Sequence, residues 1–152
     1  MKRSAGLLLV ALALSVTGVA CGGRWVPQTS PTVAFSDDAA AYDRVIGWLR
    51  SSGYDIDRQD DARKFVRVKA KLDGDVVLQP TAGGFGPPKA VKRESYFGIQ
   101  VDATGNVTIT PSGYHVRPED GGVMHRDLAA ELDSLVNGLV GAGGKSAAGR
   151  AI

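Results

Sequence analysis

The chain has 152 residues, with 18 lysines and arginines against 16 aspartates and glutamates, and it contains a single cysteine. This length is enough for one hydrophobic core, and a single cysteine excludes an internal disulfide. Without Lys2 and Arg3, which belong to the amino-terminal segment described next, 16 basic residues would face 16 acidic ones. The overall charge therefore gives no indication of nucleic-acid binding.

The amino-terminal segment has the three parts of an export signal. Lys2 and Arg3 are followed by an apolar run over residues 5–16 and then by small residues up to Ala20. This order is typical of a signal peptide that is removed after export. The apolar run is also too short to span a bilayer comfortably, which takes about 20 residues. We therefore expect residues 1–20 to be a signal peptide.

The segment Gly18-Val19-Ala20-Cys21 resembles the lipobox of bacterial lipoproteins. In that family the cysteine thiol receives a diacylglyceryl group and the cysteine becomes the first residue of the mature chain. The resemblance implies an acyl anchor at Cys21, on the outer side of the cytoplasmic membrane or in an outer membrane, with Gly22 favouring the latter. Gly18 departs from the branched residue usual in the motif, so ordinary signal-peptidase cleavage after Ala20 is the alternative.

Composition divides the expected mature chain into three parts. Residues 21–34 contain prolines, serine, threonines and glutamine and predict a lipidated, flexible tether. Residues 35–140 carry the periodic apolar patterns of one domain. Residues 141–152 are mostly small and predict a flexible carboxy-terminal tail.

Two segments have helical periodicity. The first is expected to begin with Ser36 as its N-cap and to end at Gly53, with one apolar stripe made of Tyr42, Val45, Ile46 and Leu49. The second runs from about Val123 to Val140, and its stripe is made of Leu128, Leu132, Leu135, Val136 and Leu139.

Between the two helices, apolar and polar residues alternate as in strands. The strand-like segments lie at 54–57, 66–71, 76–78, 97–101 and 107–110, and the last two form the clearest hairpin. Residues 80–92 are rich in glycine and proline and predict a long irregular loop.

These elements predict an α+β fold, with two helices packed on one face of a four- to five-stranded, mainly antiparallel sheet as a two-layer sandwich. In architecture alone, this arrangement resembles the lipopolysaccharide-assembly lipoprotein family, which has two helices on a four-stranded sheet behind a lipidated cysteine.

The sequence predicts no catalytic residue, no metal site and no cofactor. His115 and His125 are ten residues apart, with Glu119 and Asp120 between them, and this spacing matches no metal-ligand pattern. We expect surface histidines, or a position of His125 near the beginning of the second helix. The neighbouring pair Asp60 and Asp61 lies in a predicted turn, where exposure leaves a carboxyl unsuited to acid catalysis.

Three functions follow from these observations. The leading one is a non-enzymatic, membrane-anchored envelope lipoprotein whose small domain interacts with a protein or an envelope component. The alternative is a module that binds anionic lipid or glycolipid through Arg67, Lys69 and Lys71, which alternate with apolar residues and so share one strand face. The third is an enzyme that uses His115 or His125.

Overall fold

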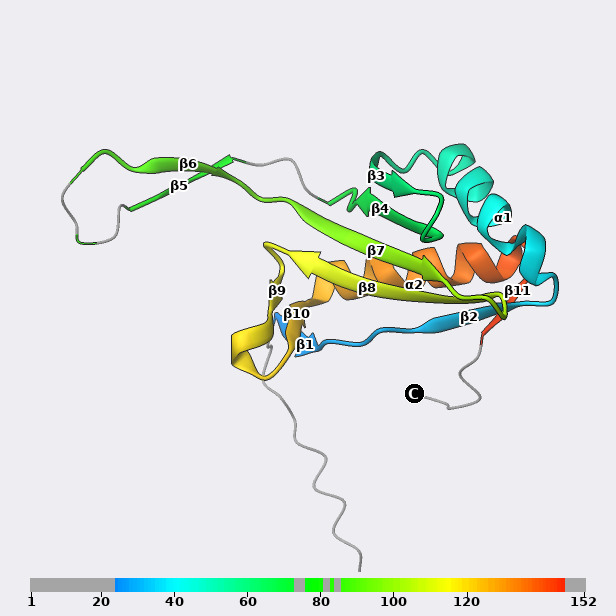
Figure 1. The fold of residues 1–152 in the computed structure, drawn as a ribbon. Helices are drawn as coiled ribbons and strands as arrows, with labels where there is room; N and C mark the ends of the chain where they lie inside the picture. The colour runs from blue at the N-terminus through cyan, green and yellow to red at the C-terminus, as the bar shows by residue number, and fades with distance from the viewer. Residues whose placement is uncertain (1–23, 73–75, 81–82, 84–85, 147–152) are drawn as a thin grey trace, which may run out of the picture.

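The computed structural model describes residues 24–72, 76–80, 83 and 86–146. Within these residues the chain forms two α-helices, one short 3-10 helix (Pro118–Asp120) and eleven strands (Figure 1). The α-helices are α1 (Asp38–Ser51) and α2 (Arg126–Gly141). The strands are β1 (Trp25–Pro27), β2 (Thr32–Phe35), β3 (Ile56–Asp60), β4 (Phe65–Lys69), β5 (Val76–Gln79), β6 (Lys89–Lys92), β7 (Ser95–Val101), β8 (Asn106–Gly113), β9 (Val116–Arg117), β10 (Val123–His125) and β11 (Gly144–Ser146).

The largest sheet has six antiparallel strands in the order β11-β2-β8-β7-β4-β3. Its centre is the β7–β8 hairpin, in which Ile99 lies opposite Ile109. The alternating pattern that predicted this hairpin places Ile99 and Ile109 in the core, where both are fully buried. The predicted β7–β8 hairpin is therefore confirmed.

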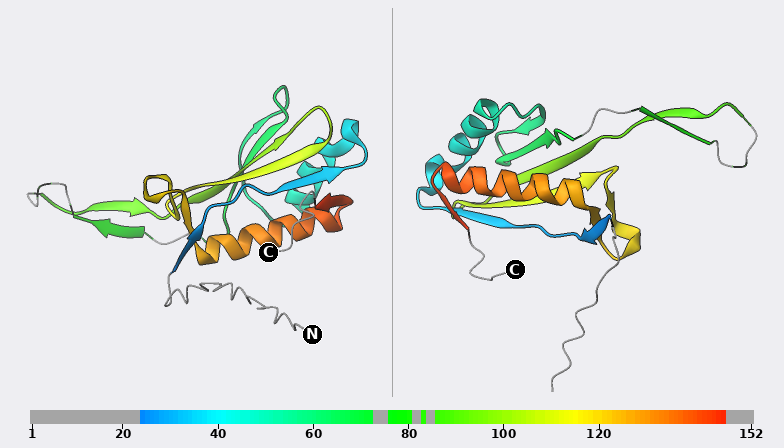
Figure 2. Two further views of the ribbon diagram at one scale, coloured as in Figure 1. Left: turned by 90° about the horizontal axis from the view of Figure 1, so that it is seen from below. Right: turned by 180° about the vertical axis from the view of Figure 1, so that it is seen from behind.

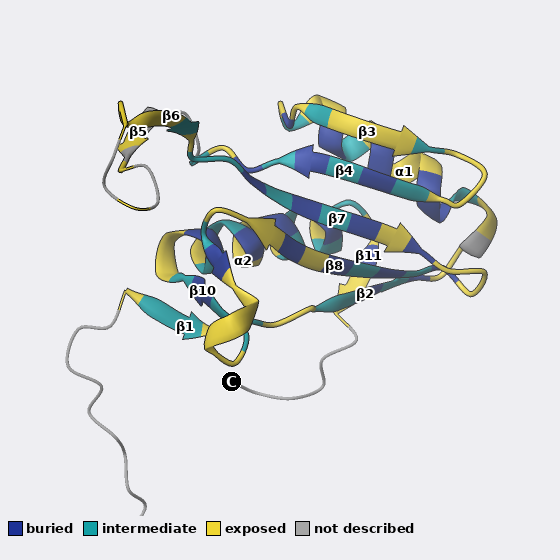
Figure 3. Cartoon of the chain, turned by 60° about the vertical axis from the view of Figure 1, so that its left-hand side comes forward, coloured by how far each residue is buried: buried dark blue, intermediate teal, exposed yellow. Residues whose placement is uncertain are grey.

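Both helices cover one face of this sheet, and their apolar stripes form the core with it (Figure 3). The stripe of α1 is buried as the helical spacing predicts, with Tyr42, Val45, Ile46 and Leu49 in the core. In α2, Leu128, Leu132, Leu135 and Leu139 are buried, whereas Val136 is partly buried against the core. Both stripes pack on strand residues such as Val66, Phe97 and Val107. The opposite face of the sheet carries polar residues of β7 and β8.

The helix termini follow local capping chemistry. The N-cap of α1 is Asp37, whose carboxylate accepts a hydrogen bond from the backbone N–H of Ala40 at 3.4 Å. The cap lies one residue after Ser36, the predicted N-cap. The helix is followed by Gly53, whose φ of +72° is the left-handed conformation that glycine adopts without strain. The N-cap of α2 is His125, whose Nδ1 accepts from the backbone N–H of Asp127 at 3.3 Å.

A smaller antiparallel sheet, in the order β1-β10-β9, lies at the beginning of α2. A separate hairpin formed by β5 and β6 projects from the body of the domain, as both views in Figure 2 show. It carries Leu78, whose surface is 67% exposed. Among the described residues, neither helix has the length and apolar character needed to cross a membrane.

The predicted fold class is wrong. The described residues form a β-rich fold with antiparallel sheets of six and three strands and an additional hairpin, not a two-layer sandwich of two helices on a four- to five-stranded sheet. The missed strands are short, and β1, β2 and β11 pair with segments that are distant in the sequence. The β11–β2 pair, for example, joins Gly144 to Phe35, and a local alternation pattern carries no information about such a partner.

Three predicted loop segments contain strands. The segment 21–34, assigned to a tether, contains β1 and most of β2, and the predicted tail over 141–152 contributes β11 at residues 144–146. The predicted glycine-rich loop over 80–92 ends in β6, which pairs with β5. As a result, the first described strand begins four residues after Cys21.

Candidate functional site

An open pocket of about 600 Å³ lies beside the small sheet β1-β10-β9. Its walls come from the beginning of β1, the segment before β7, the end of β8 and the β9–β10 hairpin. We call it the Arg–His pocket after the residues that give it its charge, Arg24, Arg93, Arg117, His115 and His125.

The structure brings the two histidines together. Their ring centroids are 5.5 Å apart, and the backbone N–H of His125 donates to the carbonyl of His115 at 2.8 Å. The register explains this proximity, because Arg117 pairs with Val123 and Val116 with Met124, so the next pair is His115 and His125. Both side chains are half-buried, and His125 lies at the beginning of α2, as one of the two expectations for these histidines had it.

Ser95, the first residue of β7, fixes the ring of His115. The side chain of Ser95 is fully buried, and its oxygen accepts from the backbone N–H of His115 at 3.0 Å while lying 2.9 Å from Nδ1 of the same residue. A buried hydroxyl held in this way positions the imidazole and is not accessible as a nucleophile. Partial burial, together with electrostatic interactions with the neighbouring His125 and Arg93, lowers the pKa of His115 below its ordinary value.

Two arginines of the pocket lie over aromatic rings. The guanidinium carbon of Arg117 is 3.9 Å from the centroid of the Trp25 ring, and that of Arg93 is 5.5 Å from the centroid of Tyr114. Trp25 in turn meets His125 edge to face at 5.6 Å. These ring contacts restrict the guanidinium groups and hold positive charge at the pocket wall.

Part of this positive charge is not neutralised within the pocket. Among its described lining residues, Glu119 is the one carboxylate. Arg117 lies 3.5 Å from Asp120, but both side chains are about half exposed, so the pairing is weak. The Nε of Arg93 is buried and has no hydrogen-bond partner among the described residues. An unsatisfied buried donor of this kind indicates a place where an acceptor can bind.

The pocket suits recognition of an anion better than metal binding. Within the part of the chain that the structure describes, no three histidine, cysteine, aspartate or glutamate side chains gather as metal ligands. Guanidinium groups, by contrast, match the oxygens of phosphate and carboxylate groups with paired N–H donors.

The cations predicted to form a binding face on β4 have partners. Arg67 donates to Asp57 at 2.6 Å and lies over the ring of Tyr96. Lys69 donates to Glu94 at 2.7 Å. The hydrogen bonds from Lys69, Tyr96 and Lys92 lower the pKa of Glu94 to about 2.

Lys71 is separated from the other two cations. It follows β4, and its Nζ donates to the carbonyl of Ser52 at 2.7 Å and lies 4.3 Å from the centroid of Tyr54. Its backbone N–H donates to Glu131 of α2. Arg67 and Lys69 thus contact the sheet strands and their connections, whereas Lys71 contacts the helical layer.

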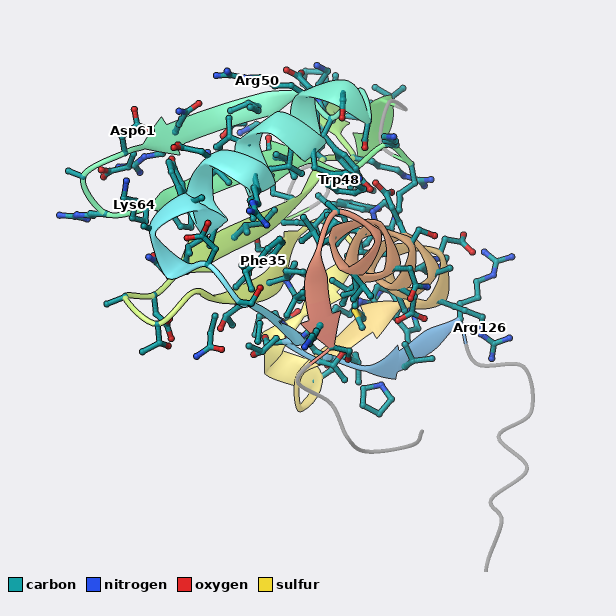
Figure 4. The ribbon with its side chains drawn as sticks, turned by 90° about the vertical axis from the view of Figure 1, so that its right-hand side faces the viewer. Phe35, Trp48, Arg50, Asp61, Lys64 and Arg126 are labelled. Atoms are coloured by element: carbon teal, nitrogen blue, oxygen red, sulfur yellow. The ribbon has the colours of Figure 1, made fainter. Side chains whose placement is uncertain are left out.

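A second pocket, of about 450 Å³, lies between α1 and the β3–β4 hairpin, and we call it the Tyr42–Asp61 pocket. Figure 4 shows its residues Asp61 and Lys64 at this end of the domain, and Arg126 near the beginning of β1. Asp61 accepts from Gln59 at 2.7 Å and from the Tyr42 hydroxyl at 2.9 Å. These bonds lower the pKa of Asp61, and burial and the same contact raise that of Tyr42 to about 12.

Sequence reasoning found the two histidines but missed the pocket. Arg24 lies in the predicted tether, Arg93 follows the predicted loop over 80–92, and Arg117 follows the predicted hairpin, so the three arginines are far apart in the sequence. The turn residues at 118–122 were the available signal, because they predict a hairpin that would place positions 115 and 125 side by side.

The predicted lipidation site, Cys21, lies outside the described residues. The chain matches no protein-family model and no curated protein sequence.

Proposed function

We propose that this protein is an exported lipoprotein, anchored to a membrane by acyl groups on Cys21, whose domain serves as a non-enzymatic binding module for a protein or an envelope component. The proposal places it on the outer side of the cytoplasmic membrane or in an outer membrane. It draws its support from the lipobox-like segment before Cys21, together with the distribution of charge in the Arg–His pocket.

The observation that carries the proposal is the short distance along the chain between Cys21 and the folded domain. β1 begins at Trp25, and four extended residues span at most about 14 Å. The expected tether of 14 residues, 21–34, would have allowed the domain to move far from its anchor. The actual spacing holds the small sheet close to any membrane that carries the acyl chains.

Binding is favoured over catalysis by the state of the polar groups in the Arg–His pocket. Ser95, the hydroxyl nearest to His115, is fully buried, and the guanidinium groups are held against aromatic rings. The guanidinium groups can hold an anion in place, and the buried Ser95 hydroxyl is not accessible as a nucleophile.

Mass spectrometry of the protein isolated from its membrane tests the anchor. We expect a mature chain that begins at Cys21 and carries acyl groups, because two or three fatty acids are needed for firm attachment. The Cys21→Ala variant should lack the lipid and be either uncleaved or released from the membrane. A wild-type protein with an unmodified amino-terminal cysteine would contradict the proposal and favour ordinary signal-peptidase cleavage.

A further inference from the structure

The position of the Arg–His pocket relative to the anchor identifies a ligand class. Trp25 lines the pocket and is the first residue of β1, so the pocket wall lies at most about 14 Å of chain from Cys21. The polar head groups of one leaflet occupy a layer of about 5–7 Å. We infer that the Arg–His pocket binds the phosphate head group of an anionic phospholipid in the membrane that holds the Cys21 anchor. This inference rests on the proposed function.

The charges in the pocket are suited to a phosphate group. Arg24, Arg93 and Arg117 line it against the single carboxylate of Glu119 among the described lining residues. Each guanidinium offers two parallel N–H donors to a pair of phosphate oxygens. Arg93 lies over the ring of Tyr114 and Arg117 over that of Trp25, so both guanidinium groups are held at the pocket wall.

The aromatic residues favour a lipid over a soluble phosphate. Trp25 and Tyr114 line the pocket beside the arginines, and tryptophan and tyrosine are enriched where a protein meets the head-group layer of a bilayer. Arg117 lies against the ring of Trp25, so the same side-chain pair offers an apolar surface and a cation. A free phosphate ion would use only the cation.

The carbonyl of Arg24 links the pocket to the beginning of α2. It accepts from the backbone N–H of Arg126 at 2.8 Å, which fixes β1 beside the helix. The side chain of Arg24 is exposed and precedes β1, so it is the pocket cation nearest to Cys21 along the chain. Arg24 and Arg117 are therefore the two arginines to substitute in a test, because both side chains are exposed and their replacement leaves the core untouched.

The test uses the mature chain, residues 21–152, carrying Cys21→Ser so that no acyl group contributes to binding. Every described core residue lies between Val33 and Leu139, so removal of the signal segment leaves the core complete. Binding is measured to vesicles of phosphatidylcholine with and without phosphatidylglycerol, and to inorganic phosphate. The pocket variant is Arg24→Gln with Arg117→Gln, and the matched control is Arg67→Gln with Lys69→Gln on β4.

We expect the protein to bind vesicles that contain phosphatidylglycerol and not those of phosphatidylcholine alone. A cation near an anionic surface contributes a factor of about five in affinity, so the pocket variant should bind about 25-fold more weakly. The control variant removes the same charge and should stay within about two-fold of wild type, because its cations are already paired with Asp57 and Glu94. Circular dichroism establishes that both variants are folded.

Three results would overturn the inference. Absence of vesicle binding would exclude a lipid ligand, and an equal loss in both variants would show diffuse attraction without a site. Tighter binding of inorganic phosphate than of the vesicles would identify a soluble phosphate as the ligand. Because the tested chain carries no acyl group, none of these results depends on whether Cys21 is acylated, which mass spectrometry decides separately.

Discussion

The Tyr42–Asp61 pocket and the Arg–His pocket are of similar size, about 450 and 600 Å³. The first lies between α1 and the β3–β4 hairpin and the second beside β1, β9 and β10, at the other end of the domain (Figure 1). In the first, the carboxylate of Asp61 accepts hydrogen bonds from Tyr42 and Gln59, so its polar groups satisfy one another. In the second, arginines stack on aromatic rings and a buried Nε of Arg93 lacks a partner among the described residues. The size of a pocket is therefore less informative than whether its charges are already paired.

Both pockets depend on one core, and substitution of Leu132 by Ala tests this. Leu132 is central in the buried stripe of α2, with 1% of its surface exposed. We expect Leu132→Ala to lower the free energy of unfolding by about 2–5 kcal/mol, the usual effect of emptying a core leucine site. Denaturant unfolding followed by tryptophan fluorescence measures the change. Leu78→Ala, on the exposed hairpin strand β5, is the control and should change stability by less than about 0.5 kcal/mol.

The end of the domain that holds the Tyr42–Asp61 pocket also depends on a close approach of the two helices. A Cβ at Gly138 of α2 would overlap the ring of Trp48 on α1. We expect Gly138→Ala to lower the free energy of unfolding by about 1–3 kcal/mol, because the ring has to move, although alanine is the better helix former.

The matched control for that experiment is Gly47→Ala. Gly47 lies within α1, and a Cβ there would meet nothing within 4 Å. The same substitution should therefore stabilise the protein by about 0.5–1 kcal/mol. Thermal unfolding of both variants and of wild type measures the two changes in stability, which should have opposite signs. A gain in stability for Gly138→Ala would mean that the helices are not in contact at Trp48.

Acidification should affect the Arg–His pocket first. The pKa of His115 is lowered by partial burial and by electrostatic interactions with His125 and Arg93, with Asp127 acting in the opposite direction. As the pH falls below about 6.5 the unfolded chain takes up a proton on this residue before the folded one, so folding stability decreases. We expect a smaller decrease in Tm between about pH 7.5 and 5.5 for His115→Gln than for wild type. An identical decrease would show that the imidazole is fully solvated.

The Tyr42–Asp61 pocket should respond only at lower pH. Hydrogen bonds from Gln59 and Tyr42 lower the pKa of Asp61, so its contribution to stability is complete above the unfolded value of about 3.9 and is lost as the pH falls through the lowered pKa. We expect Tyr42→Phe to reduce this acid dependence slightly, since one donor to Asp61 remains. Thermal unfolding below about pH 4.5, with Asp61→Asn as the reference that lacks the carboxylate, measures the difference. If wild type and Asp61→Asn lose the same stability on acidification, the acid dependence comes from other carboxylates.

The two ends of the domain also differ in how far the sequence predicts them. The helical periodicity from Tyr42 to Leu49 and the alternation of apolar and polar residues in β7 and β8 extend over enough residues to be recognised. Both elements are present in the structure. The strands β1, β9, β10 and β11 have two or three residues each, too few for a period. The Arg–His pocket is built on β1, β9 and β10. Local sequence patterns therefore could not predict that its arginines lie close together.

The pairing of β11 with β2 has a consequence for the order in which the domain is completed. Residues 144–146 pair with residues 33–35. The strand β2, which comes early in the chain, is therefore covered along one edge by β11, which ends at the last described residue. In a chain that emerges amino terminus first, β2 stays an open edge on that side until Ser146 has emerged, and open strand edges promote unwanted association. Completion of this sheet is therefore a late event, and premature termination before Gly144 would leave an exposed edge beside an otherwise formed core.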